Sequence, residues 1–328
     1  MEPLNVSLAL NIPELSLYFE QVEQALVAAA ASAVPSIQAP ITRLIQAGGK
    51  RLRPSLIIAI VISQGKEIDD KIVAGCVAVE LLHLASLVHD DVLDDADSRH
   101  DAPTVNRREG LNSALIVGNH LLARAFEQAA SAGQDVTRTV ATAFAGMCDG
   151  EARELGDRHN VNRSMDSYLA AINGKTAALF SAACRIGGLC TELPPAHVQA
   201  LARYGKKFGM AYQITDDVLD FIAAPELSGK PAGRDMHNGV YTLPLLLAPA
   251  GPRGKAGVSI PTVVDMLWQD GSLRQAIHMA YGYTRAAVAA LKGRSGMASS
   301  GLVQLPDTYL DWALKNLAAE PYRSALER

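Results

Sequence analysis

The pentapeptide Asp-Asp-Val-Leu-Asp occurs twice in this chain, at 90–94 and at 216–220, each time within a run of apolar and small residues. Residues four apart share a helix face, so each copy predicts a compact cluster of carboxylates on one helical turn. Such carboxylates repel one another and are costly to bury without a cation. Carboxylate oxygens select hard ions, and Mg²⁺ usually combines one or two of them with waters and phosphate oxygens. The two clusters, Asp90, Asp91 and Asp94 and Asp216, Asp217 and Asp220, therefore predict either raised carboxyl pKa values or bound divalent metal. If they face each other, they would suit a diphosphate carried on Mg²⁺.

A single copy of this pattern is a weak signal, because solvated acidic turns are common on helices. Two identical copies in apolar surroundings are more specific. The segments that precede them do not align well, since Leu84 to His89 comes before the first and Gly209 to Thr215 before the second. Shared chemistry therefore explains the recurrence better than an internal duplication.

Cationic groups lie near both acidic turns in the sequence. Lys50, Arg51 and Arg53 follow the pair Gly48-Gly49, Arg99 and His100 follow the first turn, and Lys230 follows the second. Each group alone could be a helix boundary with solvated charges. Together they offer donors for phosphate oxygens, bidentate where the residue is arginine.

Three further polar residues interrupt apolar helical sequence. Lys175 and Thr176 stand between small and apolar residues, and Gln213 precedes Asp216 by three positions. A lone lysine in such a helix could simply extend to solvent. Alternatively, these side chains place an ammonium, a hydroxyl and an amide on the wall of the same cavity.

Apolar residues recur at three- and four-residue spacing through most of the chain, which predicts an all-α fold. The expected helices are 14–32, 40–47, 53–64, 69–95, 110–131, 135–156, 164–188, 195–223, 240–249, 261–292 and 306–326. The helix over 69–95 would extend about 40 Å at 1.5 Å per residue and end in the first acidic turn. The helix over 195–223 would end in the second, so a bundle of both predicts a central apolar cavity with the clusters at its mouth.

Composition limits the function classes. The chain has 328 residues, 49% of them apolar, with no linker-like concentration of Pro and Gly, so we expect one domain over residues 1–328. A net charge of −4 gives no reason to expect nucleic acid. No stretch has the length and charge-free character expected of a membrane span, and the N-terminus lacks a basic start, which predicts a cytoplasmic protein. Cys76, Cys148, Cys184 and Cys190 are expected to be reduced, buried small side chains.

The motifs and their order resemble the trans-isoprenyl (polyprenyl) diphosphate synthase family. The resemblance covers roughly residues 40–250. The matching segments are Gly48 to Pro54, His83 to Asp94, Gly118 to Phe126, Gly174 to Phe180, Gln213 to Asp220 and Gly229 to Pro244. It implies an isoprenoid synthase-type helical bundle, usually a homodimer, that joins isopentenyl diphosphate to an allylic diphosphate.

The resemblance also implies a role for each matching residue. The six aspartates would hold three Mg²⁺ on the allylic diphosphate, and Arg99, Lys175 and Lys230 would add positive charge there. Lys50, Arg53 and His83 would bind the diphosphate of isopentenyl diphosphate, with Arg51 assisting. Thr176 and Gln213 would stabilise a carbocation after the allylic C–O bond breaks, in a pocket that excludes water.

The chain departs from the family pattern at its phosphate ligands. His100 and Asp101 stand where the family usually has a second Arg and a Gly, and Val240 stands where it has a Lys after Gly239. A neutral imidazole makes no two-pronged phosphate contact. This keeps two alternatives open: a terpene cyclase or lyase on the same fold, and a non-catalytic partner subunit of a prenyl synthase.

Product length is predicted from the turn before the first acidic cluster. Ala85 and Ser86 lie five and four positions before Asp90, and bulky side chains there would block a growing chain. Because both are small, we expect products of twenty carbons or more.

Overall fold

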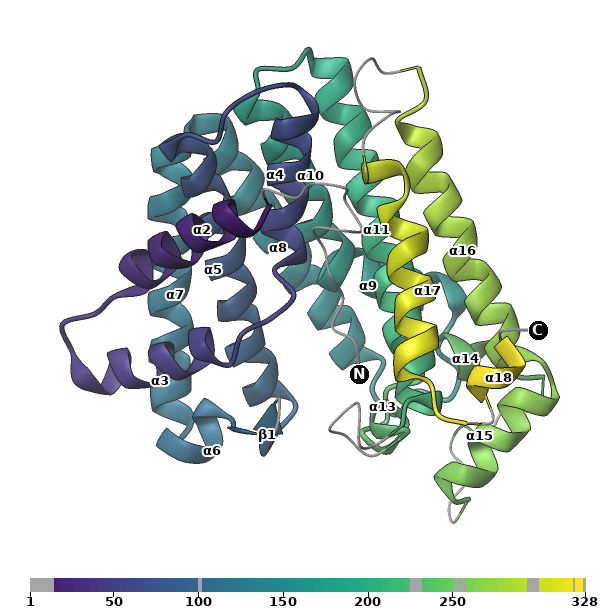
Figure 1. Cartoon of the computed structure of the whole chain (residues 1–328). Coiled ribbons are helices and arrows are strands. Elements are labelled where there is room, and N and C mark those ends of the chain that lie inside the picture. Colours follow the sequence, from purple (N-terminus) through teal and green to yellow (C-terminus); the bar gives the residue numbers. More distant parts are fainter. Residues whose placement is uncertain are drawn as a thin grey trace.

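The computed structural model describes residues 15–99, 102–224, 232–249, 253, 258–293, 301–320 and 322–326. Helices dominate these residues, which confirms the predicted all-α class (Figure 1). The elements are α2 (Leu15–Ala30), α3 (Pro35–Gln46), α4 (Leu52–Ser63), α5 (Asp70–Leu93), β1 (Ser98–Arg99), β2 (Ala102–Pro103), α6 (Val105–Glu109), α7 (Leu111–Ala132), α8 (Gln134–Gly156), α9 (Met165–Ile172), the π-helical turn η1 (Asn173–Ala177), α10 (Ala178–Cys190), α11 (Pro195–Ile222), α13 (Arg234–His237), α14 (Leu243–Leu247), α15 (Ile260–Gln269), α16 (Ser272–Ala290), the 3-10 turn η2 (Gly301–Val303), α17 (Leu305–Leu317) and α18 (Tyr322–Leu326).

Helix α5 carries the first acidic turn and runs through the core. Its N-terminus is capped by the side chain of Asp69, which accepts a hydrogen bond from the amide of Ile72 at 2.9 Å. Apolar residues lie on almost every side of this helix, and most of them are buried by the rest of the fold. The expectation that no segment has the length and composition of a membrane span is wrong here, since Asp70–Leu93 has both. However, 78% of its apolar window is buried inside the fold, as in the core helix of a globular protein.

Helix α11 carries the second acidic turn and packs closely on η1 and α10. It begins at Pro195, a residue suited to the first helical turn. A Cβ at Gly209 would lie 2.7 Å from the Cα of Ala177, so only glycine permits this approach. Figure 1 shows α5 in the half of the molecule that also holds α2, α3 and α7, and α11 in the half that holds α16 and α17.

The sequence pattern missed several breaks between helices. The predicted helix 261–292 is two helices, α15 and α16, which are separated at Gly271 with a left-handed φ of 85°. The predicted helix 306–326 is α17 and α18, and the predicted helix 164–188 contains the π-helical turn η1. The antiparallel pair β1 and β2 and the short helices α6 and α13 were not predicted.

The cysteine prediction needs one correction. Cys76 and Cys184 are buried and Cys190 is partly buried, but Cys148 is exposed on α8. Burial raises the pKa of the Cys76 and Cys184 thiols, which keeps both protonated and unreactive.

Candidate active site

A cavity of about 550 Å³ lies between α5 and α11. Helix α5 contributes His83, Leu84, Leu87 and Asp91, and its C-cap residue Asp94 continues their three- and four-residue spacing on the same face. Helix α11 contributes Tyr212, Asp216, Leu219 and Asp220 in the same way. The two acidic turns therefore border one cavity, together with apolar side chains from both helices.

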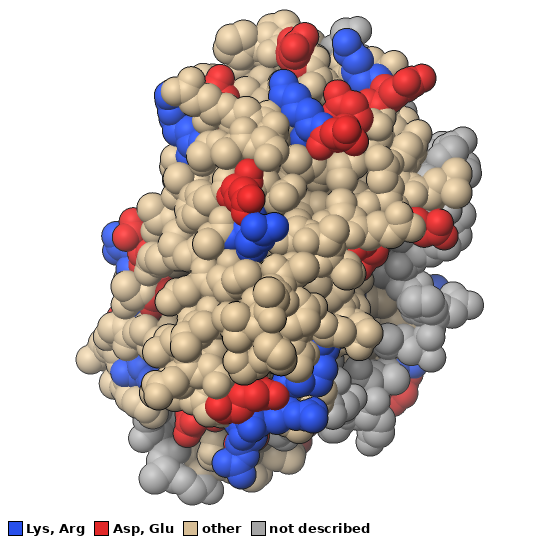
Figure 2. Space-filling view, turned by 90° about the vertical axis from the view of Figure 1, so that its left-hand side faces the viewer, with Lys and Arg blue, Asp and Glu red and all other residues tan. Residues whose placement is uncertain are grey.

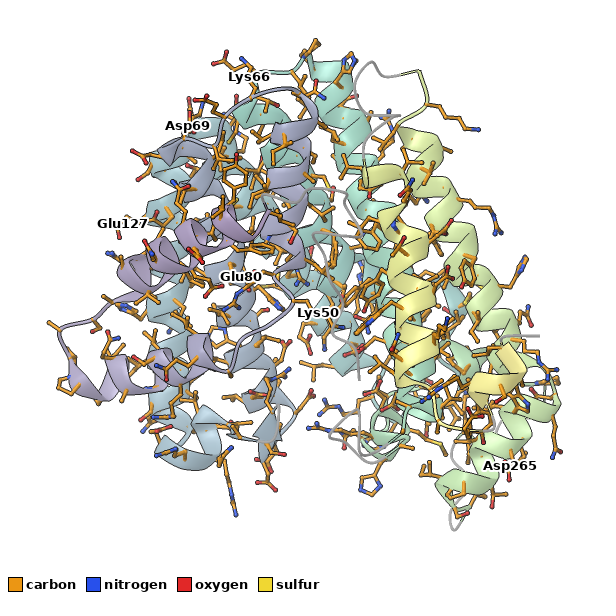
Figure 3. All side chains as sticks on the ribbon, viewed as in Figure 1. Lys50, Lys66, Asp69, Glu80, Glu127 and Asp265 are labelled. Carbon is orange, nitrogen blue, oxygen red and sulfur yellow. The ribbon has the colours of Figure 1, made fainter. Side chains whose placement is uncertain are left out.

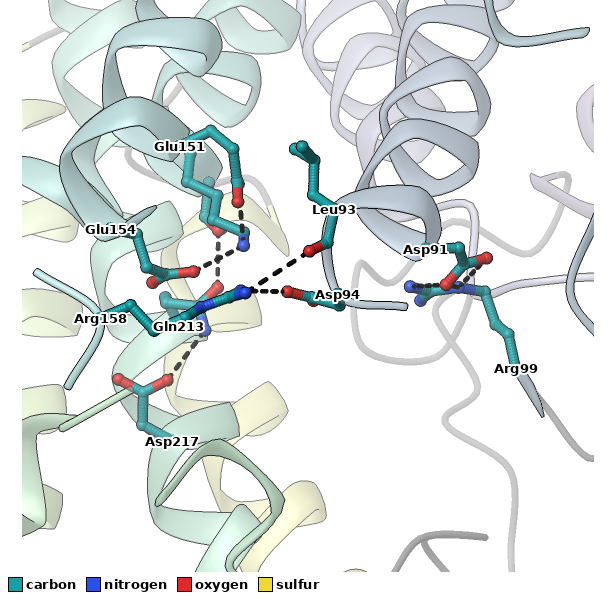
Figure 4. A network of polar contacts seen from close by, with 11 residues as sticks. Asp91, Leu93, Asp94, Arg99, Glu151, Glu154, Arg158, Gln213 and Asp217 are labelled. Atoms are coloured by element: carbon teal, nitrogen blue, oxygen red, sulfur yellow. Dashed lines mark hydrogen bonds and ion pairs between the residues drawn. The ribbon is translucent and has the colours of Figure 1, made fainter. Parts of the chain in front are cut away.

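Arginines bind two carboxylates of the first acidic turn (Figure 4). The carboxylate of Asp91 is buried and accepts hydrogen bonds from Nη2 and Nε of Arg99 at 2.8 and 3.0 Å. Asp94 accepts from Nη2 of Arg158 at 2.7 Å. Burial raises the pKa of Asp90 to about 7, although Lys175 opposes the shift.

A chain of side-chain hydrogen bonds leads to the second acidic turn. The hydroxyl of Thr176 donates to Oε1 of Gln213 at 2.6 Å, and Nε2 of Gln213 donates to Oδ1 of Asp217 at 2.9 Å. Tyr168 donates to the other oxygen of Asp217 at 2.5 Å. Asp217 is almost fully buried, and burial raises its pKa well above the ordinary value. The amide of Gln213 is thereby oriented, with its oxygen toward Thr176 and its nitrogen toward Asp217.

Lys175 lies in η1, at the point where this turn meets α8. Its ammonium contacts Glu151 at 2.8 Å and Glu154 at 2.7 Å. A Cβ at Gly150 would lie 2.2 Å from the backbone nitrogen of Lys175, so a glycine is required for α8 to approach η1 this closely. Burial alone would lower the pKa of Lys175, but Glu154, Asp90 and Glu151 together raise it well above its ordinary value, which keeps it charged.

The segment before α4 forms the cationic side of the cavity. The ammonium of Lys50 lies 4.5 Å from the ring centre of Trp312, and the guanidinium of Arg53 lies 4.6 Å from that of Phe180. Figure 3 shows Lys50 between the two halves of the bundle. Arg51 also borders the cavity, but its side chain forms ion pairs with Glu23 and Glu80, at 2.5 and 2.8 Å.

These contacts divide the three cations by environment. Lys50 and Arg53 have aromatic neighbours at the cavity, whereas Arg51 anchors its loop to α2 and α5 through carboxylates. His83 borders the same cavity from α5.

Several of the predicted positions do not border this cavity or lie outside the described residues. His100 and Lys230 are outside them. Ala85 is fully buried, Ser86 donates to the carbonyl of His83 at 2.8 Å, and neither borders the cavity described above. The chain-length role of Ala85 and Ser86 stays a prediction.

Several residues at the site were not predicted as functional. Arg158, Tyr168, Glu151 and Glu154 contact the predicted groups directly, and Trp312 borders the cavity from α17. The charged run Asp157, Arg158 and His159 in the sequence was a signal that could have pointed to Arg158. Trp312 lies in a part of the chain that carries no motif, so its place at the cavity depends on tertiary packing alone.

The donor chemistry fits a divalent metal. Among the residues that the structure describes, no three acidic, His or Cys side chains converge on one point as a ready metal cage. The two turns nevertheless supply only carboxylate oxygens, and burial also raises the pKa of Asp220, to about 8. A divalent cation between the turns would offset the repulsion among these groups, with diphosphate oxygens completing its shell.

Comparison with known proteins identifies the family. The family model for polyprenyl synthetase matches residues 34–256. The chain belongs to the polyprenyl synthetase family. Heptaprenyl diphosphate synthase component 2 of Geobacillus stearothermophilus is 36% identical over 283 residues, which cover 86% of this chain and 83% of that protein.

Solved structures of polyprenyl synthases have the same fold. The polyprenyl synthase from Caulobacter crescentus CB15, complexed with calcium and isoprenyl diphosphate, has a TM-score of 0.85 and 31% identity, and the match covers 93% of this chain and 97% of that one. The decaprenyl diphosphate synthase from Rhodobacter capsulatus has a TM-score of 0.83 and 31% identity, over 96% and 99% of the two chains. The predicted family, the isoprenoid synthase-type fold and the prediction of a prenyltransferase are confirmed.

Proposed function

We propose that this prenyltransferase condenses isopentenyl diphosphate with an allylic diphosphate and depends on Mg²⁺. The observation that carries the proposal is that Asp91 and Asp94 of one helix and Asp216 and Asp220 of another border a single cavity. Lys50 and Arg53 border the same cavity from its cationic side. The region between the acidic turns therefore suits a metal-bound diphosphate, and the region beside Lys50 and Arg53 suits a second diphosphate.

Different residues would stabilise the departing diphosphate and the carbocation. Bound Mg²⁺, three ions by the family resemblance, supplies electrostatic stabilisation of the departing diphosphate. The aspartates of both turns would hold it, and Arg99 and Lys175 add fixed positive charge where negative charge develops. Hydrogen bonds fix the orientation of Gln213 and Thr176, and by the family resemblance their dipoles would stabilise the positive charge that forms. Leu84, Leu87 and Leu219 exclude water from the reacting carbons.

We further propose that the product is an all-trans polyprenyl diphosphate of twenty carbons or more and that the enzyme acts in the cytoplasm as a single-domain homodimer. The dimer proposal is supported by α7, on which Leu111, Leu115 and Ile116 are 54%, 41% and 54% exposed. Figure 2 shows a large uncharged area on this side of the molecule. Exposed apolar side chains on one helix are typical of a surface that another subunit covers.

The deciding experiment is an incubation of the purified chain with Mg²⁺, radiolabelled isopentenyl diphosphate and farnesyl diphosphate. We expect labelled, extended prenyl diphosphates, and none from an Asp90→Ala and Asp216→Ala double variant. Unlabelled hydrocarbon or alcohol from the farnesyl substrate would instead identify a cyclase or lyase. No product without an added subunit would identify a partner subunit, an alternative that the similarity to a protein named component 2 supports.

A further inference from the structure

The loop that joins α8 to α9 fixes Arg158 beside the first acidic turn. The amide of His159 donates to the carbonyl of Gly239 at 2.7 Å. Nη1 of Arg163 donates to the carbonyl of Tyr241 at 3.0 Å, and this guanidinium is buried. The loop is therefore attached to the segment that follows the second acidic turn.

The side chain of Arg158 extends from this loop to the opposite helix. Its Nη2 donates to Asp94 at 2.7 Å, and its Nη1 lies 3.5 Å from the carbonyl of Leu93 (Figure 4). Its Nε is buried and has no hydrogen-bond partner. A cation fixed to one side of the site thus reaches the carboxylate on the other side and retains an unused donor.

Among the residues that the structure describes, Lys175, Arg99 and Arg158 contact carboxylates at or beside the first acidic turn, and their attachments differ. Lys175 is held by two glutamates that are mostly buried, and Arg99 binds the buried Asp91 through two nitrogens. Arg158 has one short contact to a carboxylate, and both partners are partly exposed, by 27% and 31%, whereas the carboxylate that Arg99 binds is buried. Partly exposed ion pairs with a single contact contribute less stability than buried, two-pronged ones and exchange partners at lower cost. Arg158 is therefore the cation that can most easily leave its carboxylate for a ligand.

We propose that Arg158 is an additional binding residue for the diphosphate of the allylic substrate. With a metal-bound diphosphate between the acidic turns, Asp94 would be one of the residues that hold the metal, and the guanidinium of Arg158 would turn from Asp94 to the phosphate oxygens. Arginine suits this exchange because its planar fork binds a carboxylate and a phosphate in the same two-pronged geometry. The inference rests on the proposed function, since it requires a diphosphate between the two turns.

The test measures binding of inorganic diphosphate in the presence of Mg²⁺ by calorimetry, without turnover. We expect Arg158→Gln to bind about tenfold more weakly than the unmodified chain, because one charge-assisted hydrogen bond is lost. Arg158→Lys, which keeps the charge, should recover part of the loss. Arg138→Gln serves as the matched control because Arg138 lies on α8 and is 71% exposed, with only a 4.0 Å contact to Asp135.

Steady-state kinetics supply the second measurement. Arg158→Gln should raise KM for the allylic diphosphate and leave KM for isopentenyl diphosphate within about twofold. Equal diphosphate binding by Arg158→Gln and the unmodified chain would overturn the inference. So would a lower Mg²⁺ requirement with an unchanged allylic KM, which would make Arg158 only a competitor of the metal. Failure of the unmodified chain to bind diphosphate would instead overturn the proposed function.

Discussion

The hydroxyl of Tyr168 lies 2.5 Å from Oδ2 of Asp217 and donates a hydrogen bond to this buried carboxyl from a different helix. The remaining oxygen of Asp217 is held by Gln213, four residues earlier on α11. Tyr168 therefore links α9 to the second acidic turn. Arg163 lies 5.5 Å from the centre of the Tyr168 ring and keeps positive charge next to this pair.

Replacing Tyr168 with Phe should destabilise the protein and displace Asp217. Leaving one oxygen of a buried carboxyl without its hydrogen bond costs about 1–3 kcal/mol of unfolding free energy. Urea denaturation measures this cost, and prenyl transfer should fall because the amide of Gln213 loses its fixed partner. Tyr281→Phe is the control, since Tyr281 donates to Asp311 at the exposed surface. Equal losses of unfolding free energy in the two variants would show that the buried hydrogen bond stabilises the protein no more than the exposed one.

The close approach of α8 to η1 should tolerate no side chain at position 150. In Gly150→Ala the new methyl group would meet the backbone nitrogen of Lys175 at 2.2 Å and the carbonyl oxygen of Ala171 at 2.6 Å. Backbone atoms cannot rotate away, so we expect a loss of about 3 kcal/mol or more and a shift of Lys175 from Glu151 and Glu154.

Gly156→Ala is the matched control for this substitution. Gly156 ends the same helix, and a Cβ there has nothing within 4 Å. Alanine in a helix is favoured over glycine by up to about 1 kcal/mol, so this variant should be neutral or slightly stabilised in thermal unfolding. Similar melting temperatures for the two variants would contradict the close approach of α8 and η1.

The sequence predicted what depends on local pattern and missed what depends on contacts between distant segments. Helical spacing predicted that Asp90 and Asp94 share one face and that Asp216 and Asp220 share another. Asp94, Asp216 and Asp220 do border the cavity, but Asp91 borders it in place of Asp90. The partners of these groups come from other elements: Arg158 from a loop, Tyr168 from α9 and Glu151 from α8. The role of Arg51 in joining α2 to α5 was also hidden, because a run of three cations gives no sign of which one meets a buried glutamate.

The raised pKa of Asp220, about 8, predicts a specific pH dependence of stability. Its main cause is burial, followed by the charge of Asp235. Between about pH 4 and pH 8 the folded protein keeps a proton that the unfolded chain releases. The contribution of this carboxyl to stability is thus fully present below about pH 4 and is lost as the pH rises through 8.

Unfolding in urea at several pH values, with a metal chelator present, measures this dependence. The unmodified protein should lose up to about 1.4 kcal/mol per pH unit from this group between pH 5 and 8. Asp220→Asn, which cannot ionise, should lose less over the same range. Parallel curves for the two proteins would contradict a raised pKa at this position.

Product length should respond to the volume of the side chain at position 85. Ala85 is fully buried on α5, next to Leu84, which borders the cavity. A chain of twenty carbons or more has to pass beyond the leucines of the cavity wall, and a larger side chain at position 85 would narrow that path. Ala85→Phe should therefore shift products to shorter chains, and Ala85→Leu should shift them less. Mass analysis of the products measures the shift, with urea unfolding as the control for overpacking in the core. An unchanged product distribution in a folded Ala85→Phe variant would show that the growing chain does not pass this turn of α5.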